Sequence, residues 1–186
     1  MNNLMRKILL RRSTYTFSEN MLRDEDLMSI LEEGKDLSNV NNNQSWHFTA
    51  IQNRTIIKYV LDCTEQAALG KLKAVNAQAA EQGGCQDILK RVPTLLVISG
   101  NGDPKYAEDA ANTLFGSMML AAEKYNIRSC WLTAKSELSE AHHDEIRQIL
   151  RIPEEYIPLS IGAFGYPVDD NDVQITRLDS VVNIIR

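Results

Sequence analysis

One apolar segment near the middle of the chain constrains the fold more than any other. Apolar residues recur there at helical spacing, at Ala107, Ala111, Leu114, Met118, Ala121 and Tyr125. Phe115, Met119 and Leu120 widen this surface around most of the cylinder, which is typical of a helix buried inside a protein. The segment is too short and too interrupted to cross a membrane, which takes roughly 20 apolar residues. It predicts a central helix over 110–122.

A short strand is expected directly after this helix. Asn126 is the predicted end of the helix, and 129–133 (Ser-Cys-Trp-Leu-Thr) predicts a buried strand. Small residues within the helix, among them Gly116 and Ser117, would let another backbone approach closely. A central helix that leads into a core strand is therefore the expected spine of the fold.

Composition places the chain among ordinary globular proteins. Its 186 residues, with 44% hydrophobic and 24% charged, suit a single domain over 1–186 that has a sizeable core. A net charge of -5 without a basic stripe argues against a nucleic-acid partner. The N-terminal sequence lacks the pattern of an export signal. Three cysteines without CxxC spacing predict reduced thiols and neither a disulfide frame nor a zinc site. We expect a cytoplasmic protein.

The remaining elements follow from apolar patterning. The continuous run over 94–99 predicts a central strand covered on both faces, and 48–51 and 159–164 predict two more strands. Helices are expected over 54–61 and 139–150. Another is expected after a cap at Ser18 or Asp24, with Gly34 as its stop. The residues alone thus indicate a soluble domain of mixed α and β structure.

Two polar segments are candidates for binding. Arg11-Arg12-Ser13 places two guanidiniums beside a hydroxyl, a set of donors suited to phosphate, although a solvated basic turn has the same composition. The segment 37–48 holds four asparagines and a glutamine, whose amides could bind a planar heterocycle. An asparagine-rich turn is the simpler interpretation of that segment.

The two adjacent histidines, His142 and His143, are not expected to form a metal site. They fall in the polar first half of the helix predicted over 139–150. Adjacent residues point about 100° apart on a helix, so this pair makes a poor chelate. No metal is expected. The sequence also contains no Gly-rich phosphate loop, nucleophile elbow or HExxH motif.

Four separated segments resemble the nitroreductase family of FMN-dependent oxidoreductases, in the order that this family uses. They are 11–17 (Arg-Arg-Ser-Thr-Tyr-Thr-Phe), 42–48 (Asn-Asn-Gln-Ser-Trp-His-Phe), 120–122 with 129–134, and 152–156 with 158–167. The resemblance implies an α+β fold, in which a central, mainly antiparallel sheet is flanked by helices. It also implies an intertwined homodimer with two FMN sites at the subunit interface.

The resemblance also implies which residues contact FMN. Those matched to the phosphate, the ribityl chain and part of the ring edge are Arg11, Arg12 and Ser13, with Arg177 also at the phosphate. Those whose backbone would approach the isoalloxazine ring are Thr133 and Ala134. Those contributed by the other subunit are Ser38, Asn39 and Asn42. The flavin carries the redox chemistry, so no catalytic acid or base is assigned.

The reaction implied by the resemblance is ping-pong. Hydride passes from NAD(P)H to flavin N5, and then to a nitro compound, a quinone or a related small-molecule acceptor. Two alternatives stay open. One is another flavin chemistry on the same fold, such as dehalogenation, azoline oxidation or flavin breakdown. The other is a non-catalytic protein that binds or stores flavin.

Several positions depart from the family pattern. Tyr15 stands where a basic residue is usual, Ser38-Asn39 where Pro-Ser is common, and Ser45 where proline is usual. Gly116-Ser117 replaces an amide pair in the central helix. A phenol donates one neutral hydrogen bond where an ammonium would add charge, so we expect Tyr15 to leave FMN bound more loosely than in relatives.

Overall fold

The computed structural model of the protein describes residues 11, 13–14, 16–37, 46–75, 91–101, 104–134 and 140–168. Its elements follow one another along the chain in a mixed order of helices and strands. They are α2 (Asp24–Leu37), β1 (Trp46–Ile51), α3 (Arg54–Val75), β2 (Thr94–Gly100), α6 (Pro104–Ala122), the 3-10 turn η2 (Glu123–Tyr125), β3 (Arg128–Ala134), α7 (Glu140–Ile149) and β4 (Ile157–Gly165).

Four strands form one sheet in the order β1-β2-β4-β3, and each neighbouring pair is antiparallel. Every residue of β2 is buried, and β2 is an inner strand whose Val97 pairs with Ile161 of β4. The central strand predicted over 94–99 is therefore confirmed. So is the α+β class with an antiparallel sheet flanked by helices.

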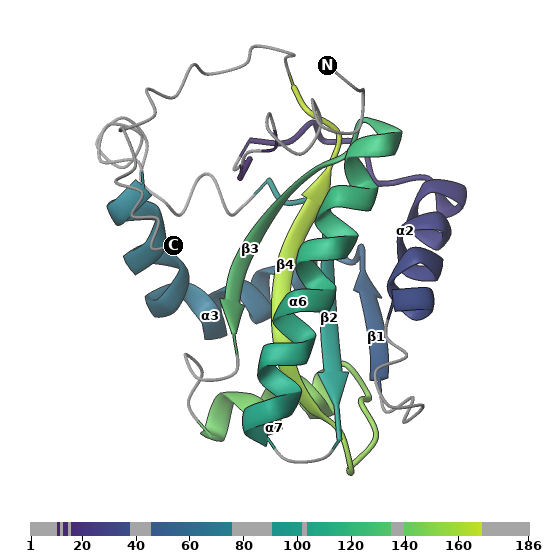
Figure 1. The fold of residues 1–186 in the computed structure, drawn as a ribbon. Coiled ribbons are helices and arrows are strands. Elements are labelled where there is room, and N and C mark those ends of the chain that lie inside the picture. Colours follow the sequence, from purple (N-terminus) through teal and green to yellow (C-terminus); the bar gives the residue numbers. More distant parts are fainter. Residues whose placement is uncertain are drawn as a thin grey trace, which may run out of the picture.

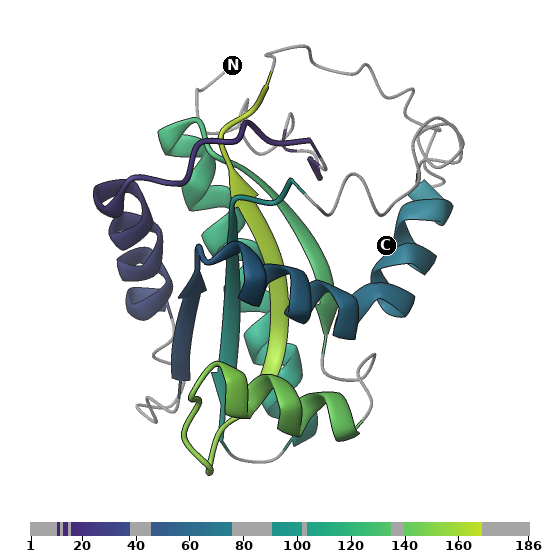
Figure 2. The same ribbon diagram turned by 180° about the vertical axis from the view of Figure 1, so that it is seen from behind.

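Helices cover both faces of the sheet (Figures 1 and 2). On one face, α6 lies along the strands and α2 packs against α6, around buried side chains such as Ile30, Leu96 and Met118. On the other face, α3 and α7 enclose a second cluster that includes Val60, Val97 and Ile146. None of the described helices has the length and apolar content that crossing a membrane requires.

The central helix is confirmed, but it is longer and less enclosed than expected. It begins at Pro104, ahead of the predicted start. Ala111, Phe115 and Met118 are buried against the sheet and α2, whereas 39% of Leu120 is exposed and Gly116 is half-buried. One side of α6 is therefore left open in the single chain.

Gly34 does not end its helix as predicted, because α2 continues to Leu37. The glycine instead allows α2 to approach α6 closely. A Cβ atom at this position would lie 2.9 Å from the sulfur of Met118. By contrast, the predicted stop at Asn126 is confirmed, since this residue adopts the left-handed conformation (φ 55°) that ends η2.

The other sequence-based elements also appear. The strands expected over 48–51, 129–133 and 159–164 lie within β1, β3 and β4, each of which extends beyond the prediction. The helices expected over 54–61 and 139–150 correspond to α3 and α7. In α7, Ile146 is fully buried, whereas 38% of Ile149 is exposed.

Gly162 in β4 sets how closely α6 can approach the sheet. A Cβ atom there would overlap the ring of Phe115 and lie 2.7 Å from the carbonyl oxygen of Cys130. We expect Gly162→Ala to lower the free energy of unfolding by about 1–3 kcal/mol, the usual cost of overpacking. Urea denaturation of the flavin-free protein measures this.

Gly116→Ala is the matched control, because a Cβ atom at Gly116 meets nothing within 4 Å. Replacing a mid-helix glycine with alanine should then raise the free energy of unfolding by about 0.5–1 kcal/mol. Equal stability of Gly162→Ala and the unsubstituted protein would contradict the packing described.

Candidate functional site

The N-terminal segment runs beside β3 and is fixed there by its backbone. Ser13 forms a parallel bridge with Ser129, the second residue of β3, and the amide of Thr14 donates to the Ser129 carbonyl at 3.0 Å. Arg11 and Ser13 are thereby carried to the open side of α6. Ser13, the last residue of the candidate phosphate segment, is thus paired with the sheet.

A cavity of about 540 Å³ lies between this segment, α6 and β3, and we call it the α6 cavity. Its volume falls within the range of about 300–1,000 Å³ that is usual for small-molecule sites. The lining combines a guanidinium, neutral polar groups and apolar side chains, with residues such as Arg11, Ser13, Asn112, Gly116, Leu120 and Trp131. A mixed lining of this kind suits a ligand that has both a planar apolar part and polar or anionic groups.

The helix side of the α6 cavity offers space and one hydrogen-bond acceptor. Gly116 presents no side chain, and a Cβ atom built there would have open space around it. One turn earlier, the buried Oδ1 of Asn112 has no hydrogen-bond partner among the described residues. Buried polar atoms normally have partners, so this oxygen is suited to accept a hydrogen bond from a bound ligand.

The charge of the α6 cavity favours an anion. Arg11 is half-buried in the lining, and no acidic side chain of the described residues lines the cavity. A guanidinium in a partly enclosed site binds phosphate or carboxylate through charge-assisted hydrogen bonds. On the apolar side, 37% of Trp131 is exposed, which leaves an aromatic surface available to a ligand.

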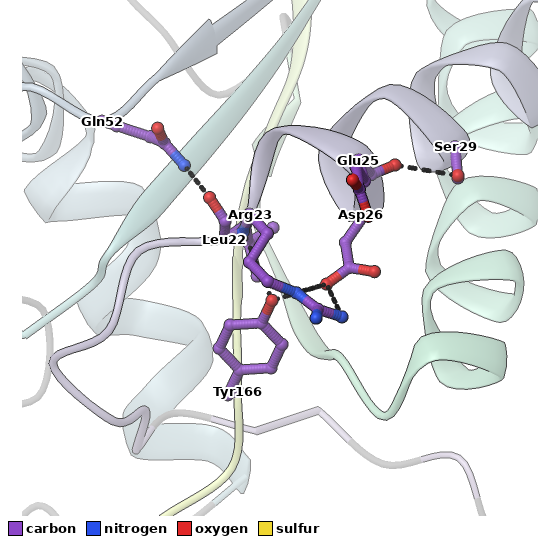
Figure 3. Close-up of polar contacts among 7 residues, drawn as sticks. All are labelled: Leu22, Arg23, Glu25, Asp26, Ser29, Gln52 and Tyr166. Carbon is purple, nitrogen blue, oxygen red and sulfur yellow. Dashed lines mark hydrogen bonds and ion pairs between the residues drawn. The ribbon is translucent and has the colours of Figure 1, made fainter.

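A second set of contacts fixes the chain between Ser13 and α2, and Figure 3 shows those among Arg23, Asp26 and Tyr166. Phe17 forms an antiparallel bridge with Pro167, and the Ser18 amide donates to the Tyr166 carbonyl at 2.9 Å. The Tyr166 hydroxyl donates to Oδ2 of the buried Asp26 at 2.6 Å, and Arg23 Nε donates to the same oxygen at 2.9 Å. These contacts tie the N-terminal segment to the end of β4 and the start of α2.

Hydrogen bonding also sets the charge of Asp26. The Arg23 guanidinium, followed by the Tyr166 hydroxyl, holds the pKa of this carboxyl below its ordinary value of 3.8. Nearby, Gln52 Nε2 donates to the Leu22 carbonyl at 2.9 Å and joins the start of α2 to the end of β1 (Figure 3).

The structure describes part of the predicted site. It brings Arg11 and Ser13 together at the α6 cavity. Thr133 and Ala134 form the end of β3 and are described by their backbone alone. The other predicted contacts lie outside the described residues, and they are Arg12, Ser38, Asn39, Asn42 and Arg177. Tyr15 and Ser45 lie outside them as well.

The sequence profile of the nitroreductase family matches residues 8–166. This chain belongs to the nitroreductase family. A relative from Archaeoglobus fulgidus, named "Putative NADH dehydrogenase/NAD(P)H nitroreductase", is 27% identical over 172 residues, which cover 92% of this chain and 90% of the relative. A relative from Methanothermobacter thermautotrophicus carries the same name and is 24% identical over 168 residues, which cover 90% of this chain and 79% of the relative.

Solved structures agree on the nitroreductase fold. A nitroreductase with bound FMN from Bacteroides fragilis superimposes with a TM-score of 0.77 at 22% identity, covering all of both chains. An oxidised iodotyrosine deiodinase bound to FMN and 3-iodo-L-tyrosine gives a TM-score of 0.73 at 19% identity, covering 97% of each chain. The family resemblance of the sequence is confirmed, while the fold by itself does not select one acceptor.

Asn112, Leu120 and Trp131 line the cavity but were not predicted as site residues. The signal for Asn112 was present, because it lies four residues before Gly116 and therefore on the same face of the helix. Apolar patterning predicts buried positions for Leu120 and Trp131, since hydropathy does not distinguish a core from the wall of a nitroreductase cavity.

The Asp26 contacts predict how stability depends on pH. A carboxyl whose pKa is lowered by folding stabilises the protein above its ordinary pKa, and this contribution is lost as the pH falls through the folded-state pKa. We expect Asp26→Asn to cost about 1.5–3 kcal/mol of unfolding free energy at pH 7, as for hydrogen bonds to a charged group. The deficit should shrink below pH 3.8.

Chemical denaturation of both proteins at pH 7 and pH 3 measures this difference. Glu25→Gln serves as the control, because Glu25 is exposed in the same turn of α2 and should change stability by less than about 0.5 kcal/mol. A deficit for Asp26→Asn that grows as the pH falls would contradict the stabilising role of the charged form.

Proposed function

We propose that this protein is an FMN-dependent oxidoreductase that uses NAD(P)H, and that FMN binds in the α6 cavity. The observation that carries the proposal is the meeting of Arg11, Ser13 and Gly116 at one cavity. A positive charge, a hydroxyl and a stretch of helix without a side chain fit a ligand with a phosphate at one end and a flat ring at the other. Membership of the nitroreductase family supports this ligand.

Each of the described cavity residues is assigned to a different part of FMN. Arg11 would pair with the phosphate, and Ser13 would donate a hydrogen bond near it. Gly116 would leave room for the ring, and Asn112 Oδ1 would accept a hydrogen bond from a ring N–H. The further contacts implied by the family stay predictions, and they are Arg12, Ser38, Asn39, Asn42, Thr133, Ala134 and Arg177.

When bound, FMN supplies the redox chemistry, which carries a hydride from NAD(P)H to a nitro compound, a quinone or a related acceptor. The protein's own part is to position and to shield. Phe115, Met119 and Leu120 form an apolar wall on one side of the cavity. Arg11 supplies fixed positive charge at its edge, and no side chain is assigned as an acid or base.

The proposed assembly is a homodimer in which a second copy helps to enclose FMN. Leu120 and Trp131 are apolar, border the α6 cavity and remain 39% and 37% exposed in the single chain. A second chain that covers them would bury apolar surface and exclude water from the cavity. The cytoplasmic location expected from the sequence stays a prediction.

Arg11→Ala tests the assignment of the phosphate. We expect it to weaken FMN about ten- to a hundred-fold, because a hydrogen bond to a charged group contributes about 1.5–3 kcal/mol. Riboflavin, which lacks the phosphate, should lose little affinity. Calorimetric titration of both flavins measures the two effects. Arg91→Ala, at an exposed arginine ahead of β2, is the control and should leave both affinities unchanged. Equal losses for FMN and riboflavin would place the phosphate elsewhere.

Anaerobic rapid mixing tests the reaction. NADH or NADPH should bleach the FMN absorption of the loaded protein, and a nitroaromatic compound or a quinone should then restore it. Steady-state rates should give parallel double-reciprocal plots, as expected when the two substrates react in two separate half-reactions. FMN that stays oxidised with both nicotinamides would instead indicate a non-catalytic flavin-binding protein. Release of halide from a halogenated phenol, without nitro or quinone reduction, would indicate dehalogenation.

A further inference from the structure

A cluster of side chains that could hold a metal ion joins α3 to α7. These two helices lie on the sheet face opposite α6 (Figures 1 and 2). It consists of Cys63 from α3, and of His142 and Glu145 from α7. One ligand atom from each residue, the thiol sulfur, an imidazole nitrogen and a carboxylate oxygen, lies within 4.8 Å of the other two. His142 and Glu145 are three residues apart, which places them side by side on one face of the helix.

A fourth residue orients this cluster. The Tyr59 hydroxyl donates to Glu145 Oε2 at 3.0 Å, and the sulfur of Cys63 lies 3.9 Å from the same oxygen. Tyr59 and Cys63 are four residues apart and therefore face α7 from adjacent turns of α3. The bond to Glu145 raises the pKa of Tyr59 from its ordinary value to about 12.

We propose that Cys63, His142 and Glu145 bind one divalent transition-metal ion of the zinc type. Thiolate, imidazole and carboxylate are the three ligand classes that Zn²⁺ uses in proteins. Harder cations such as Mg²⁺ and Ca²⁺ prefer sites made of oxygen atoms only. Three protein ligands leave a fourth tetrahedral position, which a water molecule would fill.

The distances fit this ion after small side-chain movements. Zn–N and Zn–S bonds of about 2.0–2.3 Å place tetrahedral ligands roughly 3.5 Å apart. The ligand atoms now lie up to 4.8 Å apart, and the exposed side chain of Glu145 can rotate to shorten this separation. On binding, the Cys63 sulfur forms the metal bond and its proton leaves to solvent. Tyr59 would stay hydrogen-bonded to the ligating carboxylate and orient it.

The site could not be found from the adjacent histidines. His143 is buried, and the ligand set uses His142 alone together with a cysteine from a distant helix. The proposed site does not use a His142–His143 pair, because its ligands come from two different helices. The proposed ion bridges α3 and α7 on the face of the sheet away from the α6 cavity, so we infer a stabilising role that is independent of flavin chemistry.

Metal titration of the complete, FMN-loaded protein tests the proposal. After treatment with a chelator, Zn²⁺ should bind with a stoichiometry of one ion per chain by calorimetry. Saturation with Zn²⁺ at about a hundred times its dissociation constant should raise the melting midpoint by roughly 5–10 °C. Co²⁺ should give a thiolate-to-cobalt charge-transfer band in the near-ultraviolet difference spectrum.

Three ligand variants identify the site. Cys63→Ser, His142→Gln and Glu145→Gln should each weaken Zn²⁺ by at least about tenfold, and Cys63→Ser should also abolish the thiolate band. Tyr59→Phe should weaken Zn²⁺ by about tenfold through the loss of orientation. A melting curve of each metal-free variant shows whether it folds. If Cys63→Ser does not fold, Glu145→Gln still tests the site, because Glu145 is exposed and its replacement should not disturb the core.

Exposed carboxylates beside the ligands supply matched controls. Asp62→Asn and Asp144→Asn remove a charge next to Cys63 and Glu145, respectively, and should leave Zn²⁺ affinity within about twofold. Equal losses in these controls and in Glu145→Gln would mean that the ion is held by general negative charge, which overturns the site. Wild-type affinity in Cys63→Ser, or a cobalt spectrum without a thiolate band, would overturn it as well.

Discussion

The close packing of α6 on the sheet is the contact on which the rest of the molecule depends. Phe115 lies where β4 has no side chain, at Gly162, and its ring meets that of Phe164 edge-on with the centroids 5.5 Å apart. This contact fixes the rotation of α6 about its axis. Once Phe115 and Met118 face inward, Asn112, Gly116 and Leu120 are left on the open side. The candidate site is therefore a consequence of how the core packs.

The second requirement is a fixed path for the N-terminal segment. Arg11 lines the cavity because the chain that follows is held along the sheet at Ser129 and Tyr166. Asp26 of α2 accepts a hydrogen bond from Tyr166 and so connects this path to α2. A neutral residue in place of Asp26 would form a weaker hydrogen bond than the charged carboxylate. A binding group on an irregular segment is thus placed by contacts with regular elements, and small-molecule sites commonly rely on such an arrangement.

Much of the fold could be predicted from the sequence, since apolar periodicity directly reports which faces are buried. The central helix, the buried strand β2 and the stop at Asn126 followed from such patterns. The predicted helix stop at Gly34 is wrong because glycine has two roles: it can end a helix, or it can let two helices pack closely. Only the contact with Met118 in the folded structure shows that Gly34 has the second role. The open side of α6 was also missed, since apolar residues such as Leu120 line cavities as readily as cores.

The candidate site could be predicted in part. Arg11 and Ser13 were found from their charge and hydroxyl chemistry and from the family resemblance, and the structure places both at one cavity. Asn112 and Trp131 were not found as site residues, because their role depends on the rotation of α6 and on the neighbouring strand. The Cys63–His142–Glu145 cluster was beyond sequence patterns, since its members meet only when α3 and α7 pack on the same face of the sheet.

A crystal structure of the protein grown with FMN is the most direct measurement of where the flavin binds. We expect flavin density in the α6 cavity, with the phosphate within hydrogen-bonding distance of Arg11 and the ring over Gly116. Cover of Leu120 and Trp131 by a second chain should appear in the same density. Flavin bound on the face formed by α3 and α7, or an α6 cavity filled by side chains of the partner chain, would contradict the proposed site.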